Sequence, residues 1–177
     1  MEKLQKPYSE NIIFWDTEFT SLNPYEGEIL SIGMVKPSGE ELYLEIDYNG
    51  PMDPWVEKNI LPFLTQPKVS RAEAVEKINA FFGDQRPFMV AYVNMFDTIY
   101  FYKLLGLKGT NKDFKFHWIQ IDFASMLFAN GINPERFNMK HPESIVKELG
   151  IDGTKYNLHN ALDDAKFLRE IYLKITT

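Results

Sequence analysis

The stretch NIIFWDTEF, residues 11–19, combines isoleucines with aromatic residues and predicts a largely buried β-strand. Asp16 and Glu18 stand two positions apart near its end, so both carboxylates point to the same face of the strand. Like charges at this spacing repel each other, and together they indicate a bound cation. Taken alone the pair is weak evidence, because Asp-x-Glu is common by chance and usually lies on the surface.

Two more strands are predicted directly after the first one. EILSIGMV (28–35) is an apolar run, and the turn KPSGE (36–40) leads into LYLEID (42–47). In the last stretch leucine and isoleucine alternate with polar residues, which predicts a strand with one buried face. The chain is therefore expected to open with a three-stranded antiparallel meander.

The rest of the chain alternates between helical and extended patterns. We expect strands at 87–93 and 116–120, a loop at 106–115, and helices at 54–61, 70–82, 96–105, 122–129, 142–149 and from 160 nearly to the C-terminus. This order predicts an α/β fold in which helices flank a mixed sheet, with parallel strands added to the meander. Since no repeat or long linker interrupts the pattern, residues 1–177 are expected to form a single domain.

The last predicted helix carries a carboxylate on its apolar side. In HNALDDAKFL (159–168), Asp163 projects onto the polar face and is expected to be a solvated surface charge. Asp164 projects into the apolar stripe, where an unpaired carboxylate is unfavourable. An arginine, backbone N–H groups or a metal ion would each stabilise it. The stripe itself consists of Ala161, Ala165, Leu168, Ile171, Tyr172 and Ile175.

Two further residues complete a candidate site. Asp97 begins a helix just after the predicted buried strand 87–93, and His159 lies in the loop before the last helix. Either residue alone has an ordinary structural explanation. In combination with the other carboxylates, they suit oxygen-liganded Mg²⁺ or Mn²⁺ ions and a neutral histidine that activates water. Two such ions would stabilise both the attacking and the leaving oxygen of a phosphodiester.

Composition excludes several other kinds of site. The chain has no cysteine, which rules out disulfides and thiolate chemistry, and its net charge of −6 disfavours a tight binder of long duplex DNA. We expect no membrane span and no signal peptide, because no apolar run is long enough. These features are typical of a cytoplasmic protein.

Three short motifs resemble those of the DEDDh, or DnaQ-like, 3′–5′ exonucleases, which have a ribonuclease H-like fold. DTEFTSL (16–22) is similar to D-x-E-x-T-G-L, AYVNMFD (91–97) to an apolar strand followed by Asn and Asp, and HNALDDA (159–165) to H-x-A-x-x-D-A. The third motif and its helix resemble oligoribonuclease and ribonuclease T. The segment PWVEKNILPFL (54–64) is most similar to small exoribonucleases of the mycobacterial type.

The resemblance implies a role for each site residue. Asp16, Glu18 and Asp164 would ligate two divalent cations, Mg²⁺ or Mn²⁺, with Asp97 completing the metal site. His159 would deprotonate the attacking water.

The resemblance also implies a substrate. Phe19 would contact the terminal nucleotide through its ring and Thr20 through its backbone, whereas Ser21 replaces the usual motif glycine and would be strained if the position needs a positive φ. The implied activity removes nucleotides from the 3′ end of single-stranded or overhanging RNA, and a homodimer is implied as well. The alternatives are a single-strand DNA or proofreading-type 3′–5′ exonuclease and a non-catalytic nucleic-acid-binding domain of the same fold.

Overall fold

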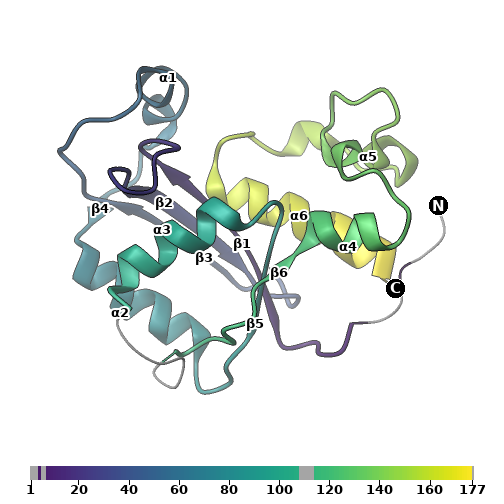
Figure 1. Ribbon diagram of the computed structural model, residues 1–177, viewed down its shortest axis with the longest axis horizontal. Helices are drawn as coiled ribbons and strands as arrows, with labels where there is room; N and C mark the ends of the chain where they lie inside the picture. Colours follow the sequence, from purple (N-terminus) through teal and green to yellow (C-terminus); the bar gives the residue numbers. More distant parts are fainter. Residues whose placement is uncertain (1–3, 5–6, 108–113, 177) are drawn as a thin grey trace.

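A computed structural model describes residue 4, residues 7–107 and residues 114–176. The predicted loop 106–115 falls mostly on 108–113, which lie outside the described residues. Six strands form one sheet in the order β4-β3-β2-β1-β5-β6 (Figure 1). Their bounds are β1 Ile12–Phe19, β2 Ile29–Val35, β3 Glu41–Ile46, β4 Lys68–Val69, β5 Phe88–Ala91 and β6 Ile121–Asp122.

The predicted meander and the added parallel strands are confirmed. β1 pairs with β2 and β2 with β3 in antiparallel fashion, whereas β5 pairs with β1 and β6 with β5 in parallel. The two-residue strand β4, parallel to β3, was not expected from the sequence. The fold is thus α/β, with a mixed sheet flanked by helices.

Helices cover both faces of this sheet (Figure 1). Buried residues of α2 and α3 pack on one face, and those of α4, α5 and α6 on the other. The α-helices are α1 Pro54–Asn59, α2 Arg71–Phe82, α3 Met95–Leu105, α4 Phe123–Ala129, α5 Ile145–Glu148 and α6 Ala161–Thr176, and the 3₁₀ helices are η1 Leu61–Phe63, η3 Pro134–Phe137 and η4 Gly153–Lys155. None of the helices in the described part of the chain is long and apolar enough to span a membrane.

Helix ends follow the signals that the sequence carries. The Asp53 side chain accepts a hydrogen bond from the backbone N–H of Trp55 (2.7 Å) and starts α1, and Ser70 caps α2 by accepting from the N–H of Glu73 (3.2 Å). Gly106, in the left-handed conformation, ends α3. The predicted helices are therefore confirmed, with shorter bounds at α1 and α5.

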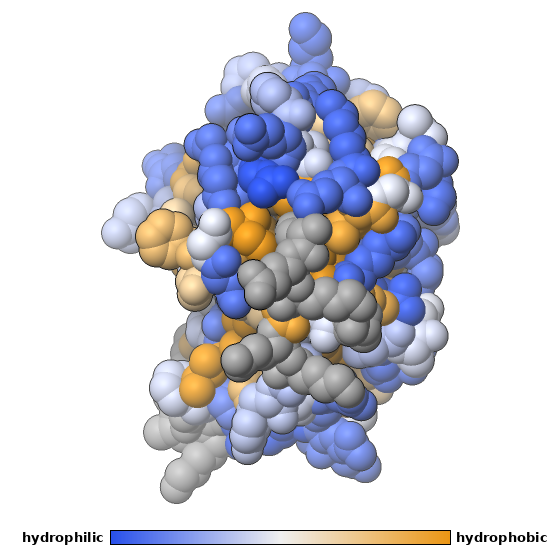
Figure 2. All heavy atoms as spheres, turned by 90° about the vertical axis from the view of Figure 1, so that its right-hand side faces the viewer, coloured by the Kyte–Doolittle hydropathy of each residue, from blue (hydrophilic) through white to orange (hydrophobic). Residues whose placement is uncertain are grey.

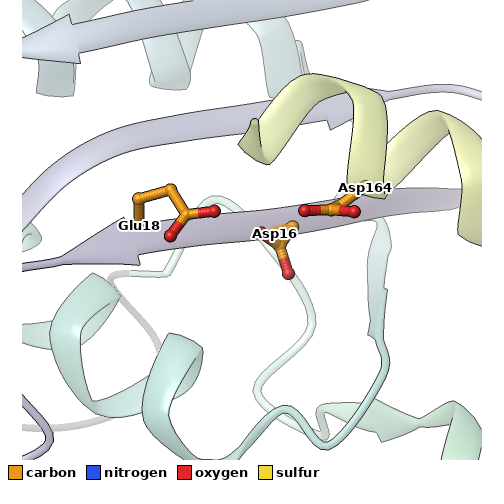
Figure 3. Close-up of side chains that lie close together, drawn as sticks. All are labelled: Asp16, Glu18 and Asp164. Atoms are coloured by element: carbon orange, nitrogen blue, oxygen red, sulfur yellow. The ribbon is translucent and has the colours of Figure 1, made fainter. Parts of the chain in front are cut away.

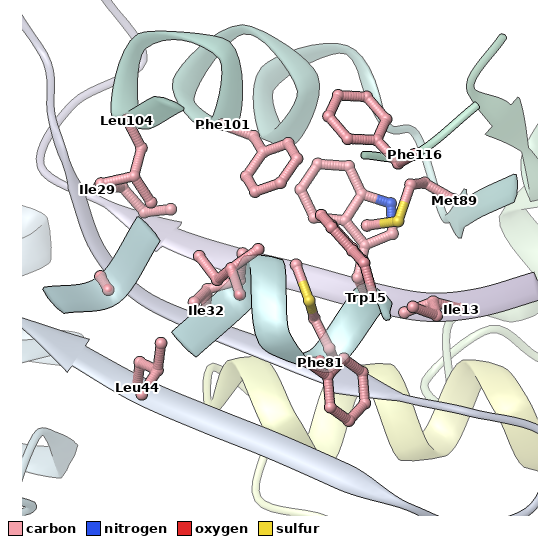
Figure 4. Close-up of a cluster of buried hydrophobic side chains, with 14 of the residues drawn as sticks. Ile13, Trp15, Ile29, Ile32, Leu44, Phe81, Met89, Phe101, Leu104 and Phe116 are labelled. Atoms are coloured by element: carbon pink, nitrogen blue, oxygen red, sulfur yellow. The ribbon is translucent and has the colours of Figure 1, made fainter. Parts of the chain in front are cut away.

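The strand expected at 116–120 is wrong. Phe116 is buried, and its ring packs against Phe101 with centroids 5.4 Å apart in the core between the sheet and α3 (Figure 4). Trp118 and Ile119 are exposed, so the aromatic pattern does not follow a paired strand. The residues that pair with β5 come immediately afterwards, in β6.

The sequence predicted that only one face of β3 is buried, and this is wrong at the C-terminal end of the strand. Glu45 is only 1% exposed, and its carboxylate accepts a hydrogen bond from the Tyr43 hydroxyl (3.1 Å). In the strand register Glu45 lies beside Ser31, which lies beside Glu18 of β1. The face of the sheet that carries Asp16 and Glu18 therefore stays polar over three strands, and both faces of this end are covered.

The start of α6 rests directly on the sheet at Gly33. A methyl group on Gly33 would lie 2.3 Å from backbone atoms of Ala161 and Leu162. In the register Gly33 is the partner of Asp16. Glycine thus allows a helix backbone to approach the strand that carries the acidic pair.

Figure 2 shows the side of the molecule that is formed by the helices next to the chain ends. This side is mainly hydrophilic, with apolar residues gathered at its centre.

We expect Gly33→Ala to push α6 away from the sheet. Overpacking of this kind costs about 1–3 kcal/mol, or about 3–10 °C in Tm for a chain of this size. Because α6 carries Asp164, affinity for Mn²⁺ should fall as well, which calorimetric titration measures. Gly83→Ala is the matched control: its added methyl meets nothing within 4 Å, but its φ of 66° makes it strained. It should lower Tm without changing Mn²⁺ affinity, and equal Mn²⁺ affinities for the two variants would contradict this role of Gly33.

Candidate metal centre and active site

Two carboxylates of the candidate site come from the part of β1 that extends past its neighbour. β5 pairs with β1 only from Ile12 to Phe14, so the backbone beyond Trp15 has no strand on that side. Asp16 and Glu18 follow there, on the sheet face covered by α6. The end of a strand next to a shorter neighbour leaves room for a substrate, as at other sheet edges where ligands bind.

The third carboxylate comes from α6. One oxygen from each of Asp16, Glu18 and Asp164 lies within 4.8 Å of the others. Figure 3 shows Asp16 and Glu18 on the strand and Asp164 reaching toward them from the helix. The apolar stripe predicted for this helix is buried as expected, so Asp164 does face inward with it.

Asp97 has a different setting. It is 6% exposed, and its Oδ1 accepts hydrogen bonds from the backbone N–H (3.0 Å) and the hydroxyl (2.6 Å) of Thr17. Asp97 thereby provides a hydrogen-bond acceptor for the unpaired edge of β1 at Thr17, the residue between Asp16 and Glu18. It lies outside the three-carboxylate cluster but close enough for its charge to raise the pKa of Asp16. Its predicted part in metal binding remains a prediction.

His159 lies in the loop before α6, as expected. Its backbone N–H donates to Oδ2 of Asp164 (3.0 Å), and its imidazole meets the indole of Trp55 edge to face, with ring centroids 5.3 Å apart. Burial, and then the positive charge of Lys140, lower the pKa of His159. The histidine is therefore neutral at pH 7, the form that accepts a proton.

The two residues of the described chain that have a positive φ without being glycine both flank this site. His159 has a φ of 68°, and Val93, just before α3, has a φ of 55°. Such a conformation costs about 1–3 kcal/mol, most clearly for a β-branched valine. The Asp122 carboxylate holds the Val93 loop by accepting from its N–H (2.8 Å). Strain of this kind concentrates at functional sites.

The carboxylates lack compensating charge. Burial, reinforced by the charges of Asp164 and Asp97, raises the pKa of Glu18 to about 8. Burial also raises the pKa of Asp164 to about 7 and that of Asp97 to about 6, although hydrogen bonds oppose both shifts. Burial and the three neighbouring carboxylates raise the pKa of Asp16 well above its ordinary value. Within the described part of the chain, no lysine or arginine forms a salt bridge to the cluster.

A divalent cation fits this arrangement. Its charge would offset the repulsion among three partly buried carboxylates, and an all-oxygen donor set suits Mg²⁺ or Mn²⁺ better than zinc. Asp16, Glu18 and Asp164 are the residues that would hold it.

The residues expected to contact the terminal nucleotide are placed next to the cluster. The Phe19 ring stacks on Tyr100 with centroids 4.5 Å apart and remains partly exposed. Thr20 is buried, and its N–H, hydroxyl and carbonyl are bonded to Glu28 and Asp53. A nucleotide contact through the Thr20 backbone would require exchange of these bonds, so Phe19 is the more accessible of the two.

The concern about Ser21 does not apply. Ser21 is not among the described residues with positive φ, so serine is unstrained here. Its carbonyl accepts a hydrogen bond from the Tyr100 hydroxyl, and its own hydroxyl accepts from the N–H of Asn23 (3.0 Å). The loop after the first motif is thus fixed by polar contacts instead of a glycine turn.

Asp163 is more than the solvated charge that we expected. Its Oδ2 accepts from both the backbone N–H and the side-chain amide of Asn157, each at 3.0 Å. These bonds hold the loop that carries His159. The helix projection correctly placed Asp163 away from the acidic cluster but gave no information on this loop contact.

Sequence reasoning also missed three residues that position parts of the site. Gly33 allows the close approach of α6, and the Trp55 ring packs against His159. Asp122 holds the Val93 loop through a hydrogen bond. Trp55 lies in the segment 54–64 that the sequence analysis singled out, but nothing in the sequence placed it against His159. Gly33 is one of the glycines that strand propensity would disfavour, and such a glycine often marks a close backbone approach.

Comparison with known proteins places this geometry in a structural context. No protein-family profile and no curated protein sequence matches the chain. S. pombe Pop2p, solved in a Mg²⁺- and Mn²⁺-bound form, is similar with a TM-score of 0.67 and 16% identity over 93% of this chain and 82% of Pop2p. E. coli ExoI, in a zinc-bound complex with single-stranded DNA, gives a TM-score of 0.68 and 16% identity over 93% of this chain.

E. coli exonuclease I bound to a dT13 oligonucleotide is also similar, with a TM-score of 0.67, 15% identity and coverage of 92% of this chain. The chain spans about 40% of the length of exonuclease I. At these identities the comparison establishes the fold. The predicted ribonuclease H-like architecture, a mixed sheet with flanking helices, is confirmed.

The raised pKa of Glu18 predicts how metal-free stability depends on pH. With an ordinary value of 4.5 and a folded value of about 8, the protonated group favours the folded state, and this contribution is lost as pH rises from 4.5 to 8. In EDTA, Glu18→Gln should therefore gain Tm over the parent chain as pH rises, levelling off above about pH 8.

With saturating Mn²⁺ the order should reverse at high pH, because metal binds the deprotonated folded state and the variant lacks one ligand. Thermal scans across pH in EDTA and in Mn²⁺ measure both effects. A Tm difference that does not vary with pH in EDTA would contradict the buried, uncompensated state of Glu18.

Proposed function

We propose that residues 1–177 form a cytoplasmic, single-domain, metal-dependent 3′–5′ exoribonuclease of the DEDDh type. The observation that carries the proposal is the cluster of Asp16, Glu18 and Asp164, brought together from a strand and a helix with a neutral histidine on the adjoining loop. The three sequence motifs place the same residues in the same roles. The fold shared with Pop2p and exonuclease I supports this proposal.

Each residue of the candidate site has a definite task in the proposed reaction. Asp16, Glu18 and Asp164 would hold two divalent cations, with Asp97 completing the set while it keeps β1 in place. When bound, these cations would supply Lewis-acid stabilisation of the phosphodiester oxygens. His159 takes the proton of the attacking water, and Trp55 limits the rotation of its ring.

The substrate in this proposal is a single strand that enters with its 3′ end at Phe19. Aromatic stacking on a base contributes about 1–3 kcal/mol and accepts any base. The preference for RNA follows from the resemblance to oligoribonuclease-like enzymes, as does a homodimeric assembly. Single-stranded DNA is the second candidate, favoured by the similarity to E. coli exonuclease I, which was solved with a DNA oligonucleotide.

A time course on 5′-labelled single-stranded RNA and on its DNA counterpart tests the activity. With Mg²⁺ or Mn²⁺ we expect a ladder that shortens from the 3′ end, no reaction in EDTA, and none with Asp16→Ala. The ratio of RNA to DNA rates identifies the substrate. If the folded protein binds both strands but cleaves neither, the exonuclease proposal fails and the protein is a non-catalytic nucleic-acid-binding domain.

Variants of the last motif separate metal binding from proton transfer. Asp164→Asn should abolish turnover and the rise in Tm that Mn²⁺ causes. His159→Ala should lower kcat by about 10²–10⁴ and leave that rise in Tm intact. Asp163→Asn, the neighbouring control, keeps an oxygen for Asn157 and should stay active. An inactive Asp163→Asn with an active Asp164→Asn would refute the assignment of the helix face.

A further inference from the structure

A cavity of about 700 Å³ opens beside the carboxylate cluster. Its lining includes Asp16, Asp164 and His159 of the site and most residues of the segment from Glu135 to His141. This segment contains the end of η3 and runs through the green chain between α4 and α5 in Figure 1. A volume of this size accommodates a nucleotide-sized ligand.

The cavity lies to one side of the cluster. Its lining includes Asp16 and Asp164, whereas Glu18, Phe19 and Thr20, farther along β1, are not part of it in the described chain. In the proposed function Phe19 and Thr20 receive the 3′-terminal nucleotide. A strand cut at the cluster must continue away from Phe19, and the cavity, which contacts the cluster but not Phe19, offers room for it.

The wall formed by this segment combines aromatic and apolar surfaces. Tyr92 and Phe137 stack with ring centroids 4.0 Å apart and an interplanar angle of 12°, and Met139 is also part of the lining. The Tyr92 hydroxyl donates to the carbonyl of Pro134 (3.0 Å), which fixes the wall to the end of β5. Rigid aromatic surfaces beside a phosphate path are typical of sites for single-stranded nucleic acid.

The same wall carries one lysine, a positive charge that the carboxylate side lacks, together with the acidic Glu135 at its far end from Lys140 in the sequence. Lys140 and His141 both line the cavity, and Lys140 is close enough to His159 to influence its proton affinity. Nδ1 of His141 accepts a hydrogen bond from the N–H of Glu143 (3.1 Å), so neutral His141 carries its proton on Nε2 and can donate it. These two donors suit the non-bridging oxygens of a phosphate.

We infer that this cavity holds the nucleotide on the 5′ side of the scissile bond, with its base against the Tyr92–Phe137 pair and its phosphate beside Lys140 and His141. The inference rests on the proposed function and adds a second subsite to it. It explains why a site of four carboxylates in an acidic chain can take a polyanion: the cations bind at the cluster, and the phosphate next along the strand meets Lys140.

Two substrates test this subsite in the full chain. A dinucleotide that carries a 5′-phosphate fills both subsites, whereas the 5′-p-nitrophenyl ester of thymidine monophosphate has one nucleoside and a p-nitrophenolate leaving group in place of the 5′ neighbour. For Lys140→Ala and His141→Gln, we expect the ratio of kcat/KM for the dinucleotide to kcat/KM for the ester to fall about tenfold, through KM of the dinucleotide. Taking this ratio cancels any effect of Lys140 on His159.

Lys147→Ala is the matched control, because it removes the same charge from an exposed position on α5 outside the cavity lining. Its ratio should equal that of the parent chain. An unchanged ratio for both cavity variants would overturn the inference. If the ratio is unchanged because kcat/KM falls equally on both substrates, Lys140 and His141 act in the chemical step instead.

Equilibrium binding keeps the inference separate from the proposed function. Fluorescence anisotropy of a labelled dinucleotide that carries a 5′-phosphate, measured in Ca²⁺, needs no turnover. Affinity should fall about tenfold for Lys140→Ala and not for Lys147→Ala. If the parent chain hydrolyses neither substrate but this difference holds, the activity fails and the subsite stands. If the parent chain hydrolyses the ester and Lys140→Ala binds the dinucleotide normally, the activity stands and the subsite fails.

Discussion

The contact between the first turn of α6 and Gly33 is the constraint on which the acidic site depends. A helix normally stands off a sheet by the length of its side chains, yet here backbone atoms of Ala161 and Leu162 occupy the space that a Cβ would need. Because Gly33 is the register partner of Asp16, this approach brings Asp164 to the acidic pair on β1. The last helix and the first strand, far apart in sequence, thereby form one site.

The site is held in a state that is unfavourable without a partner. Three carboxylates share a small, partly buried volume, and their pKa values are raised because burial and mutual repulsion disfavour the charged forms. Val93 and His159 add backbone strain on either side. The surrounding structure compensates through well-packed cores on both faces of the sheet and through hydrogen bonds such as those from Thr17 to Asp97. Without a bound cation, the crowded carboxylates and the strained backbone lower the free energy of unfolding. Such a cost is common at sites that bind a ligand.

The sequence was informative wherever a local pattern carried the structure. The strands of the meander, the caps at Asp53 and Ser70, and the inward face of α6 follow from spacing and residue type, and the structure agrees with them. Prediction failed where long-range contacts decided the outcome. Phe116 looked like part of a strand because it is aromatic, but it fills the core beside Phe101, and pairing with β5 begins only at Ile121. Glu45 looked solvent-facing by alternation and is buried because its strand is covered on both faces.

By itself, the sequence determined which residues can carry the chemistry and on which kind of element each one stands. Side-chain periodicity is local, so the positions of Asp16, Glu18 and Asp164 on their elements are encoded within a few neighbouring residues. Only the tertiary structure decided that these three oxygens meet, that Asp97 binds Thr17, and that Lys140 and His141 line the same cavity as Asp16 and Asp164. These relations depend on how closely two distant segments approach each other, and that distance is set by packing, such as the missing side chain of Gly33, which no local pattern records.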